Sequence, residues 1–449
     1  MTRSTATVRQ NVVYSVLDYI CQPMIMIVAA PLLLRSLGVL QYGTWMLVNS
    51  ITATASGLAG GFGDGATKYV SMYRSRQDHR AATNSVLAIL FVNCALGLAF
   101  AVTMAACGPW LITRVFAVPP ALQQTAVIAL RISAALLVVR FAEAVYTSTT
   151  RGYERYRPMV QLSIVARVST TIAAVLLARS GYGLVPILWT TLLIAAASLA
   201  GQAWLAHNML HSRVWLGWCG ISTALHEVFS FSAFTWIKST LGVLVGHADR
   251  LLVGALLGTG PLAFYALCNQ LTQPMHALMA SAFNFIFPQL SAQTASGDWL
   301  QAWRAYRTAA RVAGWSVLAM SATLIAASKI VLHLWLGMAA ATEYRTLLIA
   351  MAVGNGLLAV TVVPHYAALA LGRSRALAGI NLVAGILSLG GGYLLIHRIG
   401  VLGAGFARII AGVVFLWVFH SVRKAWSRQI RDASPATAAL PSAGLDFAQ

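Results

Sequence analysis

The stretch VVYSVLDYICQPMIMIVAAPLLL (residues 12–34) decides the class of this protein, because Asp18 is its single charged residue. The hydrocarbon core of a bilayer is about 30 Å thick, and a helix needs about 20 apolar residues to cross it. The stretch is too long for a signal-peptide core, and no A-x-A cleavage pattern ends it. We therefore expect a retained first membrane span.

The rest of the chain repeats this pattern. Of its 449 residues, 59% are hydrophobic and 9% are charged, against about 25% charged in an ordinary soluble domain. This composition excludes a soluble enzyme, a disordered chain and a disulfide-stapled secreted module, and unbroken apolar runs disfavour an outer-membrane barrel. Twelve spans are predicted, at residues 12–34, 42–64, 84–106, 125–146, 159–178, 184–206, 229–257, 264–288, 311–333, 346–370, 377–396 and 401–420.

The basic residues predict the orientation of these spans. The predicted loops on the side of the N-terminus carry nineteen Lys and Arg residues, and the opposite loops carry five. Cytoplasmic loops are the basic ones, so both termini are expected in the cytoplasm. The net charge of +20 is spread over short loops, which argues against a nucleic-acid partner.

An internal repeat divides the chain into two halves of six spans. PLLLRSLGVLQYGTWMLVNS (31–50) aligns with LLVGALLGTGPLAFYALCNQ (251–270) at an offset of 220, with Gly38 and Gly258 among the identical positions. Repeated halves are common in transporters. We expect an N-terminal six-helix lobe at 1–206, a cytoplasmic inter-lobe loop at 207–228, a C-terminal six-helix lobe at 229–420 and a disordered tail at 421–449.

Motifs for other chemistry are missing or weak. The sequence has no Walker A motif for ATP. Its five cysteines form no CxxC pair, and the spacing of its histidines fits a solvated loop better than a metal site. No cofactor or metal is therefore expected. The segment WLQAWRAYRTAAR (299–311) is amphipathic and is predicted to lie at the headgroup level, where anionic lipid is an alternative partner.

Ionisable residues inside the spans are the candidate functional residues, because each costs about 2.5–3.5 kcal/mol to insert at the centre of a bilayer. Asp18 and Lys238 are related by the offset of 220 and are expected to face each other across the lobe interface. Arg140 and Glu143 are three residues apart on a helix and are expected to pair. The remaining candidates are Arg167, Asp249, Arg250 and Arg408, with Asp64 and Lys68 near a span end.

The residues of the first half resemble a known family. Leu37, Gly38, Tyr42, Gly43 and Trp45 follow the L-G-x3-Y-G-x-W pattern of bacterial polysaccharide flippases, and a glycine-rich span end and the basic-aromatic segment 68–71 come next. These flippases belong to the multidrug/oligosaccharidyl-lipid/polysaccharide exporter superfamily. Asp249-Arg250, Tyr265 and Pro288 are similar to its seventh and eighth spans.

This resemblance implies an all-α fold of two six-helix lobes around a central cavity, as in MATE-type exporters, in the bacterial inner membrane. It implies an alternating-access transporter, not an enzyme, that flips an undecaprenyl-pyrophosphate oligosaccharide for O-antigen or exopolysaccharide assembly. The expected cavity cations are Lys238, Arg250, Arg140, Arg167 and Arg408. The expected coupling or gating residues are Asp18, Asp249, Glu143, Asp64 and Lys68.

Three alternatives stay open: a multidrug or cation antiporter of the same superfamily, a membrane enzyme, and a scaffold of the assembly machinery. The antiporter requires more buried acids than cations, and the reverse is found here. The enzyme requires a large external loop with polar residues, which the sequence does not contain. A proton or sodium ion, membrane lipids and a polysaccharide polymerase are further expected partners.

Overall fold

The computed structural model describes residues 5–57, 60–210 and 246–432, without the side chains of 5–13, 15–16, 19–20, 60–64 and 428–432. These residues form helices and contain no strand. The first half comprises α1 (Thr5–Gly57), α2 (Gly60–Ser75), α3 (His79–Trp110) with a π-helical turn (Leu111–Val115), α4 (Pro120–Gly152), α5 (Tyr156–Arg179) and α6 (Leu184–Leu210).

The described part of the second half begins with the helical residues 246–257. It continues with α8 (Thr259–Ala282), α9 (Ile286–Ala295), α10 (Trp299–Leu336), α11 (Met338–Val360), α12 (Val362–Ala370), α13 (Ser374–Ile399), α14 (Val401–Phe415) and α15 (Trp417–Asp432). Nine helices in the described part are long and apolar enough to cross a membrane. The described helices fit the twelve predicted spans, because α1 holds two of them, on either side of Gly38, α8 and α9 together fit one, and residues 246–257 are the described part of the seventh predicted span.

The backbone repeats at the offset of 220 that the sequence indicates. Gly38 has φ 77° and ψ 163°, and Gly258 has φ 83° and ψ −170°. Both lie in a region that is essentially restricted to glycine, so each sharply turns the chain between two spans. Asp78 and Asp298, also 220 apart, each cap the following helix by accepting a backbone N–H.

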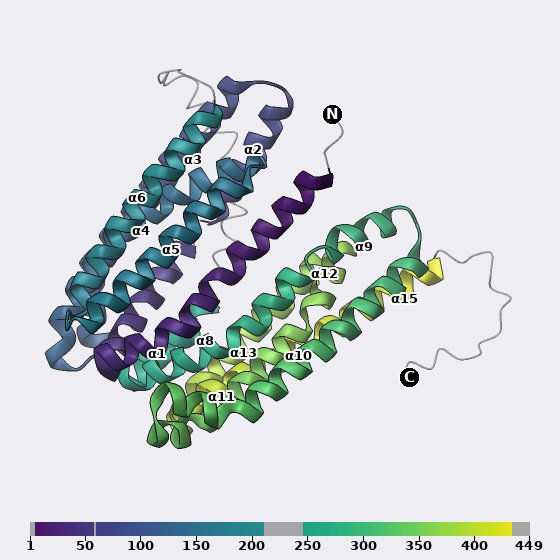
Figure 1. Cartoon of the computed structure of the whole chain (residues 1–449). Coiled ribbons are helices and arrows are strands. Elements are labelled where there is room, and N and C mark those ends of the chain that lie inside the picture. The colour runs from purple at the N-terminus through teal and green to yellow at the C-terminus, as the bar shows by residue number, and fades with distance from the viewer. Residues whose placement is uncertain (1–4, 58–59, 211–245, 433–449) are drawn as a thin grey trace.

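The helices form two groups that meet at one end and diverge at the other (Figure 1). Helices α2 to α6 lie in one group and α8 to α15 in the other, with α1 on the side of the first group that faces the second. At the closed end Gln270 donates to the hydroxyl of Tyr42 (3.3 Å), and Arg35 donates to the carbonyl of Leu334. A Cβ atom at Gly43 would lie 1.8 Å from the Thr259 carbonyl oxygen, so only glycine permits this contact.

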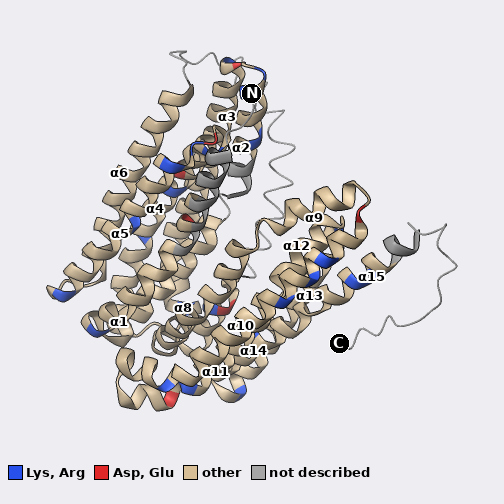
Figure 2. Ribbon diagram, turned by 45° about the vertical axis from the view of Figure 1, so that its right-hand side comes forward, with Lys and Arg blue, Asp and Glu red and all other residues tan. Residues whose placement is uncertain are grey.

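The outer surface of the described helices carries large apolar side chains, such as Trp315 and Leu193. Such a surface is typical of contact with lipid. Basic side chains clearly outnumber acidic ones along the described helices (Figure 2).

Three spans of the second half break before their ends. The interruptions lie at 283–285, at Thr361 and at Leu416. The break at Thr361 has a local cause, because Pro364 cannot donate to the carbonyl of Val360 and its ring crowds that carbonyl. The short helices α9, α12 and α15 that follow the breaks pack together around α12.

Three sequence predictions need correction. Helix α15 continues to Asp432 through the predicted tail, because Val418, Val422 and Trp426 form a buried face. Helix α6 continues to Leu210, beyond the predicted lobe boundary, and most of the predicted inter-lobe loop lies outside the described residues. The segment 299–311 is the first third of α10 and no separate helix, and its Tyr306 is buried with its ring stacked on Trp426.

Candidate functional site

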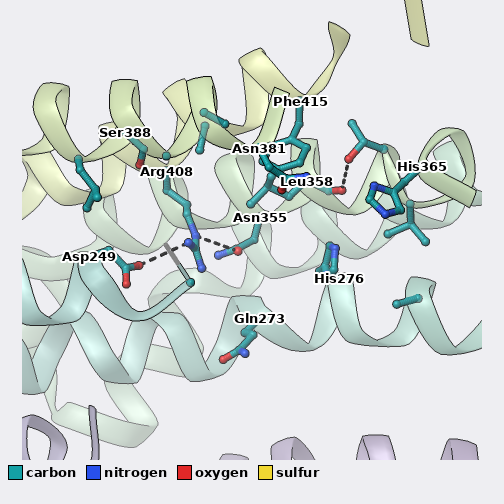
Figure 3. Close-up of a pocket in the computed structure, with 18 of the residues that line it drawn as sticks. Asp249, Gln273, His276, Asn355, Leu358, His365, Asn381, Ser388, Arg408 and Phe415 are labelled. Atoms are coloured by element: carbon teal, nitrogen blue, oxygen red, sulfur yellow. Dashed lines mark hydrogen bonds and ion pairs between the residues drawn. The ribbon is translucent and has the colours of Figure 1, made fainter. Parts of the chain in front are cut away.

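A cavity of about 490 Å³ lies within the second half. Residues 246–249 and helices α8, α11, α12, α13 and α14 form its walls. Its lining combines polar side chains with apolar ones such as Leu358 and Phe415 (Figure 3). The volume falls in the range of about 300–1,000 Å³ that is usual for small-ligand sites.

Asp249 lies at one end of this cavity with both carboxylate oxygens engaged. Its Oδ2 accepts a hydrogen bond from the Tyr265 hydroxyl at 2.6 Å and lies 3.4 Å from Nη1 of Arg408. Its Oδ1 accepts from the backbone N–H of Arg250 at 2.8 Å. The charge of the carboxylate is therefore balanced by Arg408, and both of its oxygens accept hydrogen bonds.

Arg408 is held from a second side by the amide of Asn355. Nε of Arg408 donates to Oδ1 of Asn355 at 3.2 Å, and Nδ2 of Asn355 donates to the Thr272 hydroxyl at 2.8 Å. The chain of polar contacts links α14, α11 and α8. Gly354 makes it possible, because a Cβ atom there would lie 2.8 Å from the backbone carbonyl carbon of Arg408.

Other polar groups of the cavity retain hydrogen-bonding capacity. His276 makes no hydrogen bond within the described part of the chain, and its side chain extends from α8 into the cavity, beside Asn355 (Figure 3). The Ser388 hydroxyl donates to the Ala407 carbonyl, which leaves its oxygen as an acceptor. Asn381 uses one amide proton on the Leu377 carbonyl, so its Oδ1 remains available.

A second charged cluster lies in the first half, between α1, α4 and α5. Oδ1 of Asp18 lies 2.9 Å from Nη1 of Arg167, and Oδ2 lies 3.6 Å from Nη2 of Arg151. The Arg167 guanidinium also donates to the Asp18 backbone carbonyl at 2.7 Å. Two arginines therefore share one carboxylate, and the cluster carries an excess positive charge.

The predicted pair of Arg140 and Glu143 is present in α4. Nη1 of Arg140 lies 2.7 Å from Oε2 of Glu143, and the Ser198 hydroxyl of α6 donates to Oε1 at 2.7 Å. Glu143 is buried, and both of its carboxylate oxygens accept hydrogen bonds, one from Arg140 in the preceding turn of α4 and the other from Ser198 in α6. This geometry indicates a structural pair that fixes α4 against α6.

The structure brings together some of the predicted site residues and separates others. Asp249 and Arg408 share the cavity, whereas Arg250 donates from its guanidinium to Gln273 (3.2 Å). Lys68 is exposed and lies 5.3 Å from the centre of the Tyr69 ring. Lys238 and the side chain of Asp64 lie outside the described residues, so the predicted contact of Asp18 with Lys238 stays a prediction. In the described part, no three His, Cys, Asp or Glu side chains gather as a metal site would require.

The uncharged polar residues of the cavity were missed by the search for buried charges. His276, Asn355, Asn381 and Ser388 all line it. Asn381 and Ser388 are seven residues apart, so they lie on one face of α13. A search for every polar residue at helical spacing inside an apolar run could have found them.

Comparison with known proteins identifies related sequences and folds. Residues 74–340 match the family described as polysaccharide biosynthesis protein. No curated protein matches the sequence.

Several solved structures are similar over nearly the whole chain. One is an inward-facing multidrug resistance MATE family transporter of the MOP superfamily (TM-score 0.72, 16% identity, 93% of this chain and 99% of that one). Another is a MOP superfamily transporter from Pyrococcus furiosus, described by the reverse polarity of its binding pocket (0.68, 16%, 92% and 96%). A third is the lipid II flippase MurJ in an inward closed conformation (0.69, 12%, 94% and 90%). At these identities the likeness establishes the fold.

Proposed function

The chain belongs to the polysaccharide biosynthesis protein family, and we propose that it flips a polyprenyl-pyrophosphate-linked oligosaccharide between the leaflets of the bacterial inner membrane. The observation that carries the proposal is the charge balance of its spans. The charged clusters described above contain more arginines than acids, and all of these residues lie within spans or at their ends. The five arginines are Arg140, Arg151, Arg167, Arg250 and Arg408, and the three acids are Asp18, Glu143 and Asp249. Guanidinium groups can replace the hydration of a diphosphate by charge-assisted hydrogen bonds.

The cluster around Asp18 suits the anionic head of such a substrate. The side chains of Arg151 and Arg167 are 44% and 32% exposed, so both guanidinium groups are accessible to a ligand without a movement of the backbone. Asp18 holds them together when no phosphate is present. An arriving diphosphate would compete with Asp18 for the same guanidinium protons, and the released carboxylate could take a coupling proton or sodium ion.

The same contacts disfavour a cation antiporter. A site for an organic cation needs an accessible carboxylate, and the three intramembrane acids of the described residues already contact arginine. Both oxygens of Asp249 and of Glu143 accept hydrogen bonds. An organic cation that binds one of these carboxylates would first have to break its existing ion pair with arginine.

The two diverging groups of helices fit transport by alternating access. With both termini in the cytoplasm, as the nineteen-to-five charge bias supports, the helices diverge toward the cytoplasm and meet near the periplasm. Rocking of the two groups of helices about the closed end would present the saccharide and its phosphates to the outer leaflet while the lipid tail stays in the bilayer. In this role the chain is a transporter that carries out no chemical step, and it delivers undecaprenyl-linked saccharide to a polysaccharide polymerase.

The proposal is tested with purified protein in proteoliposomes that hold lipid-linked saccharide extracted from cells lacking the protein. Arg167→Gln is expected to slow flipping by about tenfold or more, because a charge-assisted hydrogen bond to the phosphate contributes roughly 1.5–3 kcal/mol. Arg167→Lys should retain part of the rate. Arg179→Gln, an exposed position at the end of the same helix, is the matched control.

Two results would count against the proposal. In the first, the wild-type protein moves no lipid-linked saccharide but exports an organic cation. In the second, Arg167→Gln flips the lipid at the wild-type rate while the protein is present in normal amounts. Lys238→Ala is expected to slow flipping in the same assay, because the resemblance makes Lys238 a cavity cation.

A further inference from the structure

The cavity of the second half differs in chemistry from the Asp18 cluster. Its arginine, Arg408, is already balanced by Asp249 at 3.4 Å and held by Asn355 at 3.2 Å. The pair adds no net charge to the cavity. The Asp18 cluster, by contrast, has two guanidinium groups for one carboxylate. The two halves therefore contain charged sites of different net charge.

The groups that remain available in the cavity are neutral donors and acceptors. His276 offers one donor and one acceptor in either neutral tautomer, Ser388 offers an acceptor, and Asn381 offers both. They come from α8 and α13, which line different walls of the cavity. Leu358 and Phe415 add apolar surface to the same lining. A polar cavity at membrane depth is suited to a hydrated or hydroxyl-rich occupant.

Other occupants fit these groups less well. A cation would find no available carboxylate, since both oxygens of Asp249 accept hydrogen bonds. A phosphate would have to displace Asp249 from the buried Arg408, whereas Arg151 is more exposed. An acyl or prenyl chain would leave His276 and Asn381 without partners. A neutral polyhydroxyl compound matches both the donors and acceptors and the apolar patches.

We infer that this cavity is the saccharide subsite of the transporter and that the Asp18 cluster is its anion subsite. The inference rests on the proposed function. It assigns the saccharide of the substrate to the second half of the chain and the phosphates to the first half. Hydroxyl groups of the sugar would contact His276, Asn381 and Ser388, and the C–H face of a ring would lie on Phe415 or Leu358. The Asp249–Arg408–Asn355 network acts as a fixed wall of this subsite.

The first test is protection of a cysteine in the cavity. Ser388→Cys in a cysteine-free background is modified with a maleimide, with and without the oligosaccharide released from the lipid-linked pool. The saccharide is expected to slow modification severalfold, and inorganic pyrophosphate is expected to have no effect. Ser296→Cys, in the exposed loop before α10, should be unaffected by either. If Ser388→Cys does not fold, Asn381→Cys takes its place.

The second test separates this inference from the proposed function. In the flipping assay, His276→Ala and Asn381→Ala should each raise KM for the lipid-linked saccharide by roughly two- to tenfold, the range for one hydrogen bond. His276→Gln should recover part of the affinity, and His333→Ala, exposed at the end of α10, should have no effect. Wild-type flipping with no cysteine protection and unchanged KM in both variants would overturn the saccharide subsite alone. Absence of wild-type flipping would overturn the proposed function.

Discussion

The contact between Asp249 and Arg408 places two opposite charges inside the membrane domain. Their side chains are 13% and 18% exposed, so each would be costly without the other. Tyr265 and Asn355 complete the hydrogen bonds that the pair leaves open. A buried pair of this kind need not stabilise the fold, but removal of one partner leaves an uncompensated charge.

The first prediction follows from this asymmetry. Arg408→Leu is expected to lower the free energy of unfolding by about 3–5 kcal/mol, because Asp249 would remain buried without its counter-ion. Asp249→Asn combined with Arg408→Leu should recover most of the loss. Thermal unfolding of the detergent-solubilised protein measures both, with the exposed Arg398→Leu as the control. A double variant as unstable as Arg408→Leu would contradict the argument.

At this scale the sequence identified charged residues better than their partners. Asp18, Asp249 and Arg408 are conspicuous because a charge inside an apolar run is rare. The Arg140–Glu143 pair was predictable because residues three apart meet on one helix face, and it is confirmed. The contacts of Asp18 with Arg151 and Arg167 depend on which helices pack together, and one sequence does not contain that information. Neutral polar residues such as Asn355 carried no comparable signal.

At the scale of elements, the positions of the spans follow from hydropathy, and the repeat follows from Gly38 and Gly258. Their matching backbone angles confirm the offset of 220. The break at Thr361 follows from Pro364, a local signal in the sequence. The break at Leu416 and the length of α15 were not predicted. They depend on packing among α9, α12 and α15 after these short helices have formed, and a hydropathy window averages over such breaks.

The two glycines give a matched prediction. Gly38→Ala is expected to destabilise the protein by about 1–3 kcal/mol through backbone strain alone, since the added Cβ would meet no neighbouring atom within 4 Å. Gly258→Ala should cost more, because the same Cβ would lie 2.6 Å from the Ala117 carbonyl oxygen. Thermal unfolding compares the two variants directly. A milder effect at Gly258 than at Gly38 would contradict the described turn.

Helix α15 gives a second prediction at this scale. Trp426 is 1% exposed and stacks on Tyr306, whereas Trp417 in the same helix is 69% exposed. Trp426→Ala is expected to lower the free energy of unfolding by about 3–5 kcal/mol, the usual cost of truncating a buried aromatic side chain. Trp417→Ala should have little effect. Equal unfolding temperatures for the two variants would show that α15 does not pack as described.

At the scale of the whole molecule, composition alone determined the class of the protein. The all-α two-lobed fold is confirmed by its similarity to MATE-type structures, and the resemblance to polysaccharide flippases is confirmed by the family match over residues 74–340. The substrate and the divergence of the lobes could not be read from the sequence, because both depend on how the halves are placed in space.

The orientation in the membrane is tested with reporter fusions. Fusions after Arg80, Arg157, Arg311 and Arg375 should report the cytoplasm, because the basic loops are retained there. Fusions after Val118, Gly181, Gly260 and Glu343 should report the periplasm. One clear reversal in the first set would break the twelve-span topology.

The most direct measurement of the central claim is the leaflet that holds the lipid-linked saccharide in cells with and without this protein. Intact cells or spheroplasts are treated with a membrane-impermeant probe that modifies only saccharide on the outer leaflet. The account predicts that deletion leaves the saccharide on the inner leaflet and that the wild-type chain restores its access to the probe. Equal access in both strains, with equal amounts of lipid-linked saccharide, would contradict flipping by this protein.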